Sequence, residues 1–238
     1  MAEILERTLS ACFYGLEKSY PEYLSLMHDL HARVAHNLIS DQLMLLEHKP
    51  VITYTRQHKH KSLLTNPEEI TNSGIDLYEA DRGGDATFHG PGQLVGYPII
   101  NIKNLDIITY IRKLEESLLL ALKNLGLKSL LLIPGFTGIW LKNNNSKINL
   151  KKLCAIGVGI KDGVSKHGFA LNITINSAPY VKHIIPCGLQ DRGIVTLKEA
   201  FLEEDLEMPD YSAILMSISE SIAQTFSLKL CFKGLYHG

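Results

Sequence analysis

The sequence has almost no net charge, few cysteines and no long uninterrupted apolar run. Its 24 lysines and arginines balance 25 aspartates and glutamates, which argues against a nucleic-acid-binding protein, because such proteins normally carry a clear positive excess. Four cysteines without a Cys-x-x-Cys pair argue against a disulfide scaffold or a zinc ribbon. The most apolar stretch, 118–136, contains Lys123, Lys128 and Pro134, so we expect no membrane-spanning segment. The N-terminus lacks the pattern of a signal or transit peptide, and we therefore expect a cytoplasmic protein.

Several common catalytic motifs are also missing. The chain has no Gly-x-x-x-x-Gly-Lys-Ser/Thr phosphate loop, no Gly-x-Gly-x-x-Gly between a strand and a helix, and no Gly-x-Ser-x-Gly elbow. No His-Glu-x-x-His occurs, and the lysines beside His58 and His60 would repel a cation. These absences argue against nucleotide-binding, serine-hydrolase and zinc-hydrolase chemistry, and we expect neither a metal nor a cofactor.

The patterning of the chain predicts one domain over residues 1–238, because no repeat and no long linker divides it. Helical periodicity predicts helices at 29–49, 106–125 and 211–226, and capping residues predict two further helices that begin at 67 and near 196. Runs of β-branched and aromatic residues predict strands at 51–55, 137–142, 153–160 and 168–176. The polar stretch 143–152 is typical of a hairpin loop. This mixture predicts an α/β fold of the α+β type, with a mixed β-sheet flanked by helices.

The densest chemical signal is the segment 82–98, RGGDATFHGPGQLVGYP, with five glycines and two prolines. Glycine lets backbone N–H groups approach a ligand closely and adopts positive φ without penalty. Arg82 and His89 add side-chain donors to this segment. From composition alone, a loop that cradles a substrate and an ordinary turn-rich connection are equally consistent with it.

Cys187 is the first candidate nucleophile, because a proline precedes it and a glycine follows it, as in an exposed turn. A free thiol with a pKa of ~8.5 is only a few per cent thiolate at pH 7, so a cation such as Lys152 is needed to activate it. His89 or His167 would instead supply a Cys–His pair. Cys154 is a second candidate, since residues two apart on a strand share a face and Cys154 would then lie beside Lys152. Both cysteines are equally compatible with simple apolar packing.

Five segments, in order along the chain, resemble the bacterial octanoyltransferases of lipoate biosynthesis: RGGDATFHGPGQLVGYPIINI, GIWL, KKLCAIGVGI, HGFALNI and IIPCGL. The resemblance covers residues 46–197 and implies the fold of biotin and lipoate protein ligases. It also implies transfer of an octanoyl group from acyl carrier protein to a lysine of lipoyl domains. Those acceptors belong to 2-oxoacid dehydrogenases and to the glycine cleavage H protein, with no nucleic-acid or membrane partner.

The same resemblance implies roles for individual residues. Cys187 is similar to the nucleophile that carries the acyl thioester, and Lys152 to the lysine that lowers the thiol pKa and serves as acid and base. Lys151 lies next to it, but the spacing to Ala-Ile-Gly favours Lys152. The family's substrate-binding stretches match a longer set of residues: Arg82, Gly83, Gly84, Asp85, Ala86, Thr87, Phe88, His89, Ala155, Ile156, Gly157, Gly168, Phe169 and Ala170.

Two alternatives remain open at the level of sequence. An ATP-dependent lipoate or biotin ligase of the same fold would activate a free acid as an adenylate and would need no nucleophilic cysteine. A non-catalytic module would bind lipoyl domains or carrier protein, also without a thiol. The Pro-Cys-Gly turn at Cys187 and the absence of the biotin-ligase motif Gly-Arg-Gly-Arg-x-Gly favour the transferase.

Overall fold

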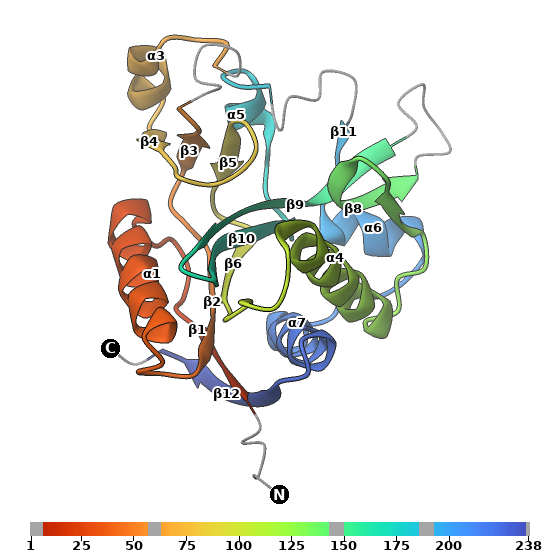
Figure 1. The fold of residues 1–238 in the computed structure, drawn as a ribbon. Helices are drawn as coiled ribbons and strands as arrows, with labels where there is room; N and C mark the ends of the chain where they lie inside the picture. Colours follow the sequence, from red (N-terminus) through yellow and green to blue (C-terminus); the bar gives the residue numbers. More distant parts are fainter. Residues whose placement is uncertain (1–6, 57–62, 143–149, 186–192, 237–238) are drawn as a thin grey trace, which may run out of the picture.

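A computed structural model describes residues 7–56, 63–142, 150–185 and 193–236 (Figure 1). Its centre is a nine-stranded mixed sheet in the order β12-β1-β2-β6-β10-β9-β8-β7, with β11 beside β9. The strands β12, β1 and β2 run parallel to one another, whereas the pairs from β2 to β7 are antiparallel. The bounds are β1 Thr8–Phe13, β2 Asp41–Leu46, β6 Gln93–Ile99, β7 Leu130–Ile133, β8 Phe136–Lys142, β9 Leu150–Lys161, β10 Val164–Asn172, β11 Gly193–Ile194 and β12 Lys229–Leu235.

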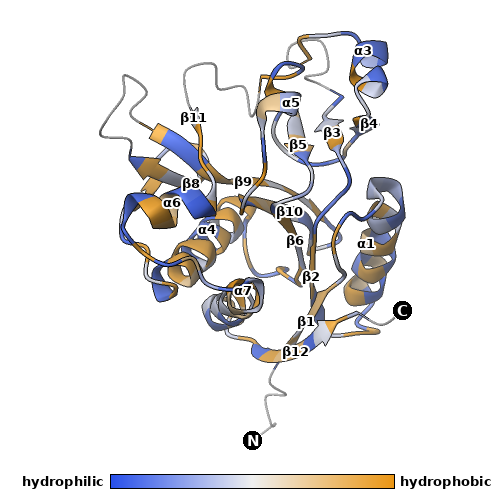
Figure 2. Cartoon of the chain, turned by 180° about the vertical axis from the view of Figure 1, so that it is seen from behind, coloured by the Kyte–Doolittle hydropathy of each residue, from blue (hydrophilic) through white to orange (hydrophobic). Residues whose placement is uncertain are grey.

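Helices cover both faces of this sheet. Helix α1 (Tyr20–Ala35) packs on β6, β10 and β2, while α4 (Ile107–Asn124) and α7 (Tyr211–Thr225) pack against each other on the opposite face. Helix α6 (Leu197–Glu203) contributes Leu197, Ala200 and Phe201 to the apolar core on the α4 side. Seen from behind in Figure 2, α1 and the α4–α7 pair again lie on opposite sides of the sheet. The fold is therefore the mixed sheet flanked by helices that the sequence predicts.

A smaller sheet in the order β4-β3-β5 adjoins the main one. Its strands are β3 Val51–Tyr54, β4 Asp76–Glu79 and β5 Thr87–His89, and it packs with α3 (Pro67–Asn72) and α5 (Ala178–Val181) around its own apolar core. The turn from β5 to β6 joins the two sheets. Gly92 holds this turn in place: its N–H donates to the buried Glu47 carboxylate, and its carbonyl accepts from three successive N–H groups at 173–175.

Several helices begin where the sequence predicts, because a capping side chain there accepts from the first backbone N–H groups. Asp106 accepts from two N–H groups at the start of α4, and Asp210 does the same for Ala213 in α7. Thr196 and Glu199 form a reciprocal capping box at the start of α6. Among the described residues, no helix is both long enough and apolar enough to cross a membrane.

The predicted helix at 29–49 is wrong over most of its length. Helix α1 begins earlier, at Tyr20, and ends at Ala35, where His36 and then Asn37, with φ +56°, turn the chain. Residues Asp41–Leu46 form β2, an almost fully buried strand between β1 and β6. An apolar run that is buried on both faces carries no alternation, so periodicity does not separate such a strand from a helix.

Candidate functional site

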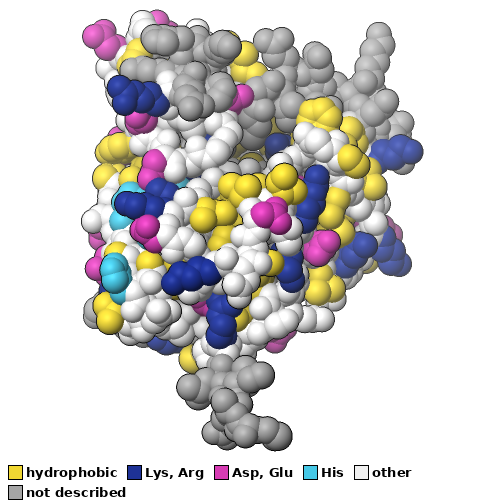
Figure 3. All heavy atoms as spheres, viewed as in Figure 1, with side chains coloured by type: hydrophobic (Ala, Val, Ile, Leu, Met, Phe, Trp, Pro, Cys, Tyr) yellow, Lys and Arg dark blue, Asp and Glu magenta, His cyan; other side chains and the backbone are white. Residues whose placement is uncertain are grey.

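A cavity of about 330 Å³ opens on the face of the molecule shown in Figure 3, where apolar side chains lie among charged ones. The glycine-rich segment, β9 and β10 form most of its wall, and the start of α4 and the β7–β8 turn complete it. Its lining outside the expected substrate-binding stretches consists of Tyr20, Val95, Tyr97, Ile107, Ile111, Gly135, Phe136, Thr137, Lys152, Val158 and His167.

The structure brings the three expected substrate-binding stretches together around this cavity. Every residue of that set except Phe88 lines it. The Gly83 N–H donates to the Val158 carbonyl over 2.9 Å, and Gly157 pairs with Gly168 across the antiparallel β9–β10 ladder. Phe88 points the other way, because neighbours on a strand alternate in direction, and its buried ring stacks on Tyr180 with centroids 4.8 Å apart.

Lys152 lines the cavity, whereas its neighbour Lys151 does not. The Lys152 ammonium lies 4.6 Å from the centroid of the fully buried Trp140 ring, close enough for a cation–π interaction. The Lys151 ammonium instead forms an ion pair with Glu203 in α6 at 3.1 Å. Of the two adjacent lysines, Lys152 is thus the one placed to act on a ligand in the cavity.

Cys154 does not share the orientation of Lys152, so that expectation is wrong. The β8–β9 register pairs Ile139 with Cys154 but Trp140 with Lys152, which leaves Leu153 as an extra residue in a β-bulge. A bulge breaks the alternation of side chains along a strand. Cys154 is fully buried in the main core and is not among the residues that line the cavity.

Cys187 lies outside the described residues, as does the insert 143–149. The chain is described again from Gly193, where β11 pairs in parallel with β9, placing Gly193 opposite Lys151 and Ile194 opposite Lys152. The Val195 N–H donates to the Lys152 carbonyl over 3.1 Å. Residues 193–195 therefore lie directly beside Lys152 in the sheet.

His89, one of the alternative bases, is a neutral group in the cavity wall. Its Nδ1 lies 2.8 Å from Gln93 Oε1, and Gln93 Nε2 donates to Asn172 Oδ1 over 2.9 Å. Burial, reinforced by the neighbouring His48, lowers the pKa of His89 to about 3. An imidazole with this pKa is a weak proton acceptor near neutral pH, which argues against His89 as the general base.

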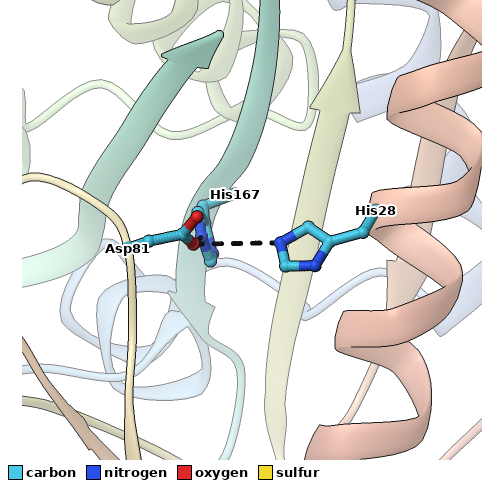
Figure 4. A group of neighbouring side chains, drawn as sticks. All are labelled: His28, Asp81 and His167. Carbon is cyan, nitrogen blue, oxygen red and sulfur yellow. Dashed lines mark hydrogen bonds and ion pairs between the residues drawn. The ribbon is translucent and has the colours of Figure 1, made fainter.

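His167, the other alternative, belongs to a charged cluster at the edge of the cavity (Figure 4). Its Nε2 lies 2.7 Å from Asp81 Oδ1, and His28 Nε2 approaches the same oxygen at 3.8 Å. The Lys166 ammonium pairs with the other Asp81 oxygen. The hydrogen bond from His167, together with Lys166, holds the pKa of Asp81 well below its usual range.

Three side chains of this cluster are of types that commonly bind metal ions: His28, Asp81 and His167. One potential ligand atom from each lies within 4.8 Å of the other two. The Lys166 ammonium already neutralises the Asp81 carboxylate and would repel a divalent cation. The cluster therefore fits a network of hydrogen bonds around the Lys166–Asp81 ion pair, which ties β10 to the loop before Arg82, better than it fits a metal centre.

Tyr20 and Tyr97 line the cavity although the sequence predicts no role for them, and the sequence likewise assigns no apolar side chain of α4 to the site. Tyr97 lies in the glycine-rich segment, but nothing local distinguishes it from a core tyrosine. Ile107 and Ile111 differ from the core-facing residues of α4 only in their exposure, which the helical periodicity alone does not reveal.

Comparisons with known proteins give a consistent result. The family of the lipoyl protein ligase A/B catalytic domain matches residues 19–217. A protein of Clostridium kluyveri named octanoyltransferase is 36% identical over 214 residues, which are 89% of this chain and 86% of that protein. A protein of the same name from Caldicellulosiruptor saccharolyticus is 34% identical and covers 94% of this chain and 91% of its own length. One from Koribacter versatilis is 43% identical over 68% of this chain, but this match spans only 63% of that relative.

Solved structures support the fold. A bipartite lipoate protein ligase from Thermoplasma acidophilum has a TM-score of 0.71 at 14% identity, covering 98% of this chain and 88% of that one. A lipoate-protein ligase A bound with ATP has a TM-score of 0.70 at 14% identity, covering 98% and 90%. At this identity the likeness concerns the fold, whereas the sequence matches concern the family. The chain therefore belongs to the lipoyl protein ligase A/B catalytic domain family, and within it to the octanoyltransferases.

Proposed function

We propose that this protein transfers an octanoyl group from acyl carrier protein to a lysine of lipoyl domains, through a thioester on Cys187. The observation that carries the proposal is the position of Lys152. Its side chain lines the cavity, and its backbone pairs with the strand that follows the Cys187 segment. A cation at this point is what an unactivated thiol needs, since a free cysteine is mostly protonated at neutral pH.

The first half-reaction exchanges one thioester for another. The Cys187 thiolate attacks the carbonyl carbon of the octanoyl thioester, the bond from this carbon to the carrier's sulfur breaks, and the electron pair leaves on that sulfur. Lys152 supplies the proton that converts the leaving thiolate to a thiol. The bond types before and after are the same, so this step conserves the activation of the acyl group.

The second half-reaction forms an amide. The lysine amine of a lipoyl domain attacks the thioester carbon, the bond to Cys187 sulfur breaks, and the nitrogen's proton passes to that sulfur by way of Lys152. An amide is more stable than a thioester, so the transfer runs forward without ATP. Lys152 acts in both steps because it faces the same cavity that holds the acyl group.

The cavity wall also fits the octanoyl chain. Val95, Ile107, Ile111, Phe136 and Phe169 contribute apolar side chains to its lining. At ~0.8 kcal/mol for each buried CH₂ group, such a wall discriminates between acyl chains of clearly different length but separates adjacent lengths only modestly.

A transfer assay tests the proposal against an ATP-dependent ligase of the same fold. The purified chain is mixed with a lipoyl domain and either octanoyl carrier protein alone or free octanoate with ATP and Mg²⁺. We expect amide formation on the lipoyl domain with the carrier protein and no amide with octanoate and ATP. The reverse pattern refutes the transferase, and no product with either donor supports a module that only binds these proteins.

A further inference from the structure

Two aromatic side chains in the cavity wall, His89 and Tyr97, have hydrogen-bonding roles that their surroundings determine. They form a ring cluster with His48, whose centroid lies 5.8 Å from that of His89 and 6.0 Å from that of Tyr97. All three side chains are buried, but only His89 and Tyr97 line the cavity. The two half-reactions described above give none of them a task.

The protonation of His89 follows from a chain of hydrogen bonds read from its far end. Asn172 Nδ2 lies 3.2 Å from the carbonyl oxygen of Val195 and 3.4 Å from that of Lys152, and carbonyl oxygens only accept. Asn172 Oδ1 therefore faces Gln93, whose Nε2 donates to it. Gln93 Oε1 is then left to accept from His89 Nδ1. His89 is held as the tautomer with its proton on Nδ1, and Nε2 carries a lone pair.

Tyr97 is constrained in the same way through His48. The Nδ1 of His48 lies 3.2 Å from the carbonyl oxygen of Lys18 and must donate to it. Burial lowers the pKa of His48 to about 4, so the ring is neutral and its Nε2 accepts from the Tyr97 hydroxyl over 2.7 Å. The phenol has one proton, and His48 takes its hydrogen bond. The Tyr97 oxygen therefore offers only lone pairs to any further partner.

We propose that His89 Nε2 and Tyr97 Oη form an acceptor-only subsite that binds the N–H groups of an uncharged amine, the side chain of the acceptor lysine. This assignment rests on the octanoyl transfer proposed above. Because neither atom donates, the pair selects a ligand that brings hydrogen-bond donors, and it offers nothing to a thioester carbonyl or a carboxylate. An amide N–H of the carrier's pantetheine arm has the same chemistry, and separate measurement of the two half-reactions distinguishes these sources.

Loss of water in the cavity favours an amine over an ammonium. Arg82 and Asp85 line the same space with opposite charges, so it is removal from water that disfavours the charged form of an entering lysine. A neutral amine has two N–H groups for the subsite and one lone pair for the thioester carbon. His89, whose pKa burial lowers to about 3, accepts a hydrogen bond without taking the proton. It is thus a positioning residue, and Lys152 remains the route for the proton.

Single-turnover measurements test the subsite. The enzyme is loaded with octanoyl carrier protein, separated from it and mixed with a lipoyl domain. Tyr97→Phe removes the acceptor oxygen and keeps the ring, whereas His89→Asn keeps an N–H for Gln93 and removes the lone pair at Nε2. We expect each change to slow transfer to the lipoyl domain at least tenfold and to alter loading less than twofold. Tyr110→Phe is the matched control, because its buried hydroxyl contacts the Pro98 carbonyl outside the cavity lining, and both half-reactions should stay within twofold.

Three results overturn the assignment. If both variants transfer at the normal rate, His89 and Tyr97 do not bind the acceptor lysine. If loading slows as much as transfer, the two side chains bind the pantetheine arm of the carrier protein instead. Nitrogen-15 NMR of labelled histidine gives a readout that does not depend on activity: we expect His89 to keep its proton on Nδ1 from pH 8 to about pH 5, with His48, Arg82 and His167 as the groups whose charges act on it. A proton on Nε2 is the third contrary result. A wild-type enzyme that does not load refutes the proposed function instead, so the two failures are distinguishable.

Discussion

The Lys152 ammonium lies over the face of the Trp140 ring, 4.6 Å from its centroid. The indole is fully buried, and its N–H donates to the Phe136 carbonyl over 3.0 Å, so the ring has a fixed orientation. Phe136 itself lines the cavity. The lysine that the proposed mechanism uses in both half-reactions is thereby held against a rigid surface at the cavity wall, where a flexible side chain would otherwise sample many rotamers.

The first prediction separates the charge of Lys152 from its ability to exchange a proton. Lys152→Arg keeps the positive charge, but a guanidinium effectively never deprotonates. A thiolate is a good leaving group and can take its proton from water, so we expect loading of Cys187 within about tenfold of the wild-type rate. Transfer to the lipoyl domain needs a base and should slow by about 100-fold or more, so that the octanoyl thioester accumulates. Quenched-flow mass spectrometry measures both steps.

Lys151→Arg is the control, since Lys151 is engaged with Glu203 outside the cavity lining and its change should leave both steps intact. If Lys152→Arg transfers octanoyl groups at the wild-type rate, Lys152 acts only through its charge. The base would then have to be another group, and His167 would be the remaining histidine candidate.

The second prediction concerns the glycine-rich wall. Gly84 lines the cavity with φ +91°, a conformation in which a β-branched residue is strained, so Gly84→Val should lower stability by about 1–2 kcal/mol and block loading. Gly74→Val is matched to it: Gly74 has φ +76° and open space around it, at the end of α3. Thermal unfolding should show similar losses for both variants, while only Gly84→Val should fail to load. Normal loading by a folded Gly84→Val protein would contradict the proposed substrate-binding role of this wall.

The third prediction concerns pH and His48. In the unfolded chain this imidazole binds a proton below pH ~6.5, whereas burial lowers its pKa in the folded protein to about 4. Between these values the unfolded state binds more protons, so stability falls as pH decreases, by on the order of 3 kcal/mol from this group at pH 4. Urea unfolding at several pH values measures the loss.

His48→Asn is the comparison for this measurement, because asparagine supplies an N–H for the Lys18 carbonyl and does not titrate. It should be less stable than the wild type near neutral pH but should decline less steeply on acidification. Parallel declines of the two proteins would show that folding does not lower the pKa of His48. The ring would then gain a proton in the folded protein as readily as in the unfolded chain, which would also remove the argument that Tyr97 donates to it.

The parts of the fold that the sequence predicts correctly are those determined by neighbours along the chain. Helix α4 follows from the Asp106 cap and the regular apolar spacing, and α6 follows from its capping box. The sequence predicts helix where strand β2 lies, because β1 and β6 flank this strand in the sheet and its burial on both faces is a tertiary effect that no local pattern reports. The bulge at Leu153, which separates Cys154 from Lys152, is likewise a property of the β8–β9 pairing.

In the candidate site, too, the sequence predicts the features that local residues determine and not those that depend on tertiary contacts. The glycine-rich segment and the Lys152 motif are visible as composition and spacing, and the family resemblance they carry is confirmed by relatives that match most of the chain. The hydrogen-bond chain from His89 through Gln93 to Asn172 joins residues up to 83 positions apart (172 − 89). Its effect on the His89 tautomer depends on carbonyl groups of Lys152 and Val195, and the amino-acid sequence does not reveal such backbone contacts.

The proposed function requires that Cys187 carries the octanoyl group. Its most direct test is the intact mass of the protein after incubation with octanoyl carrier protein, for the wild type and for Cys187→Ala and Cys154→Ala. We expect a single octanoyl adduct that hydroxylamine removes, present in the wild type and in Cys154→Ala and absent in Cys187→Ala. An adduct that persists in Cys187→Ala, or a wild-type protein that transfers octanoyl groups to a lipoyl domain without ever carrying one, would refute the thioester on Cys187.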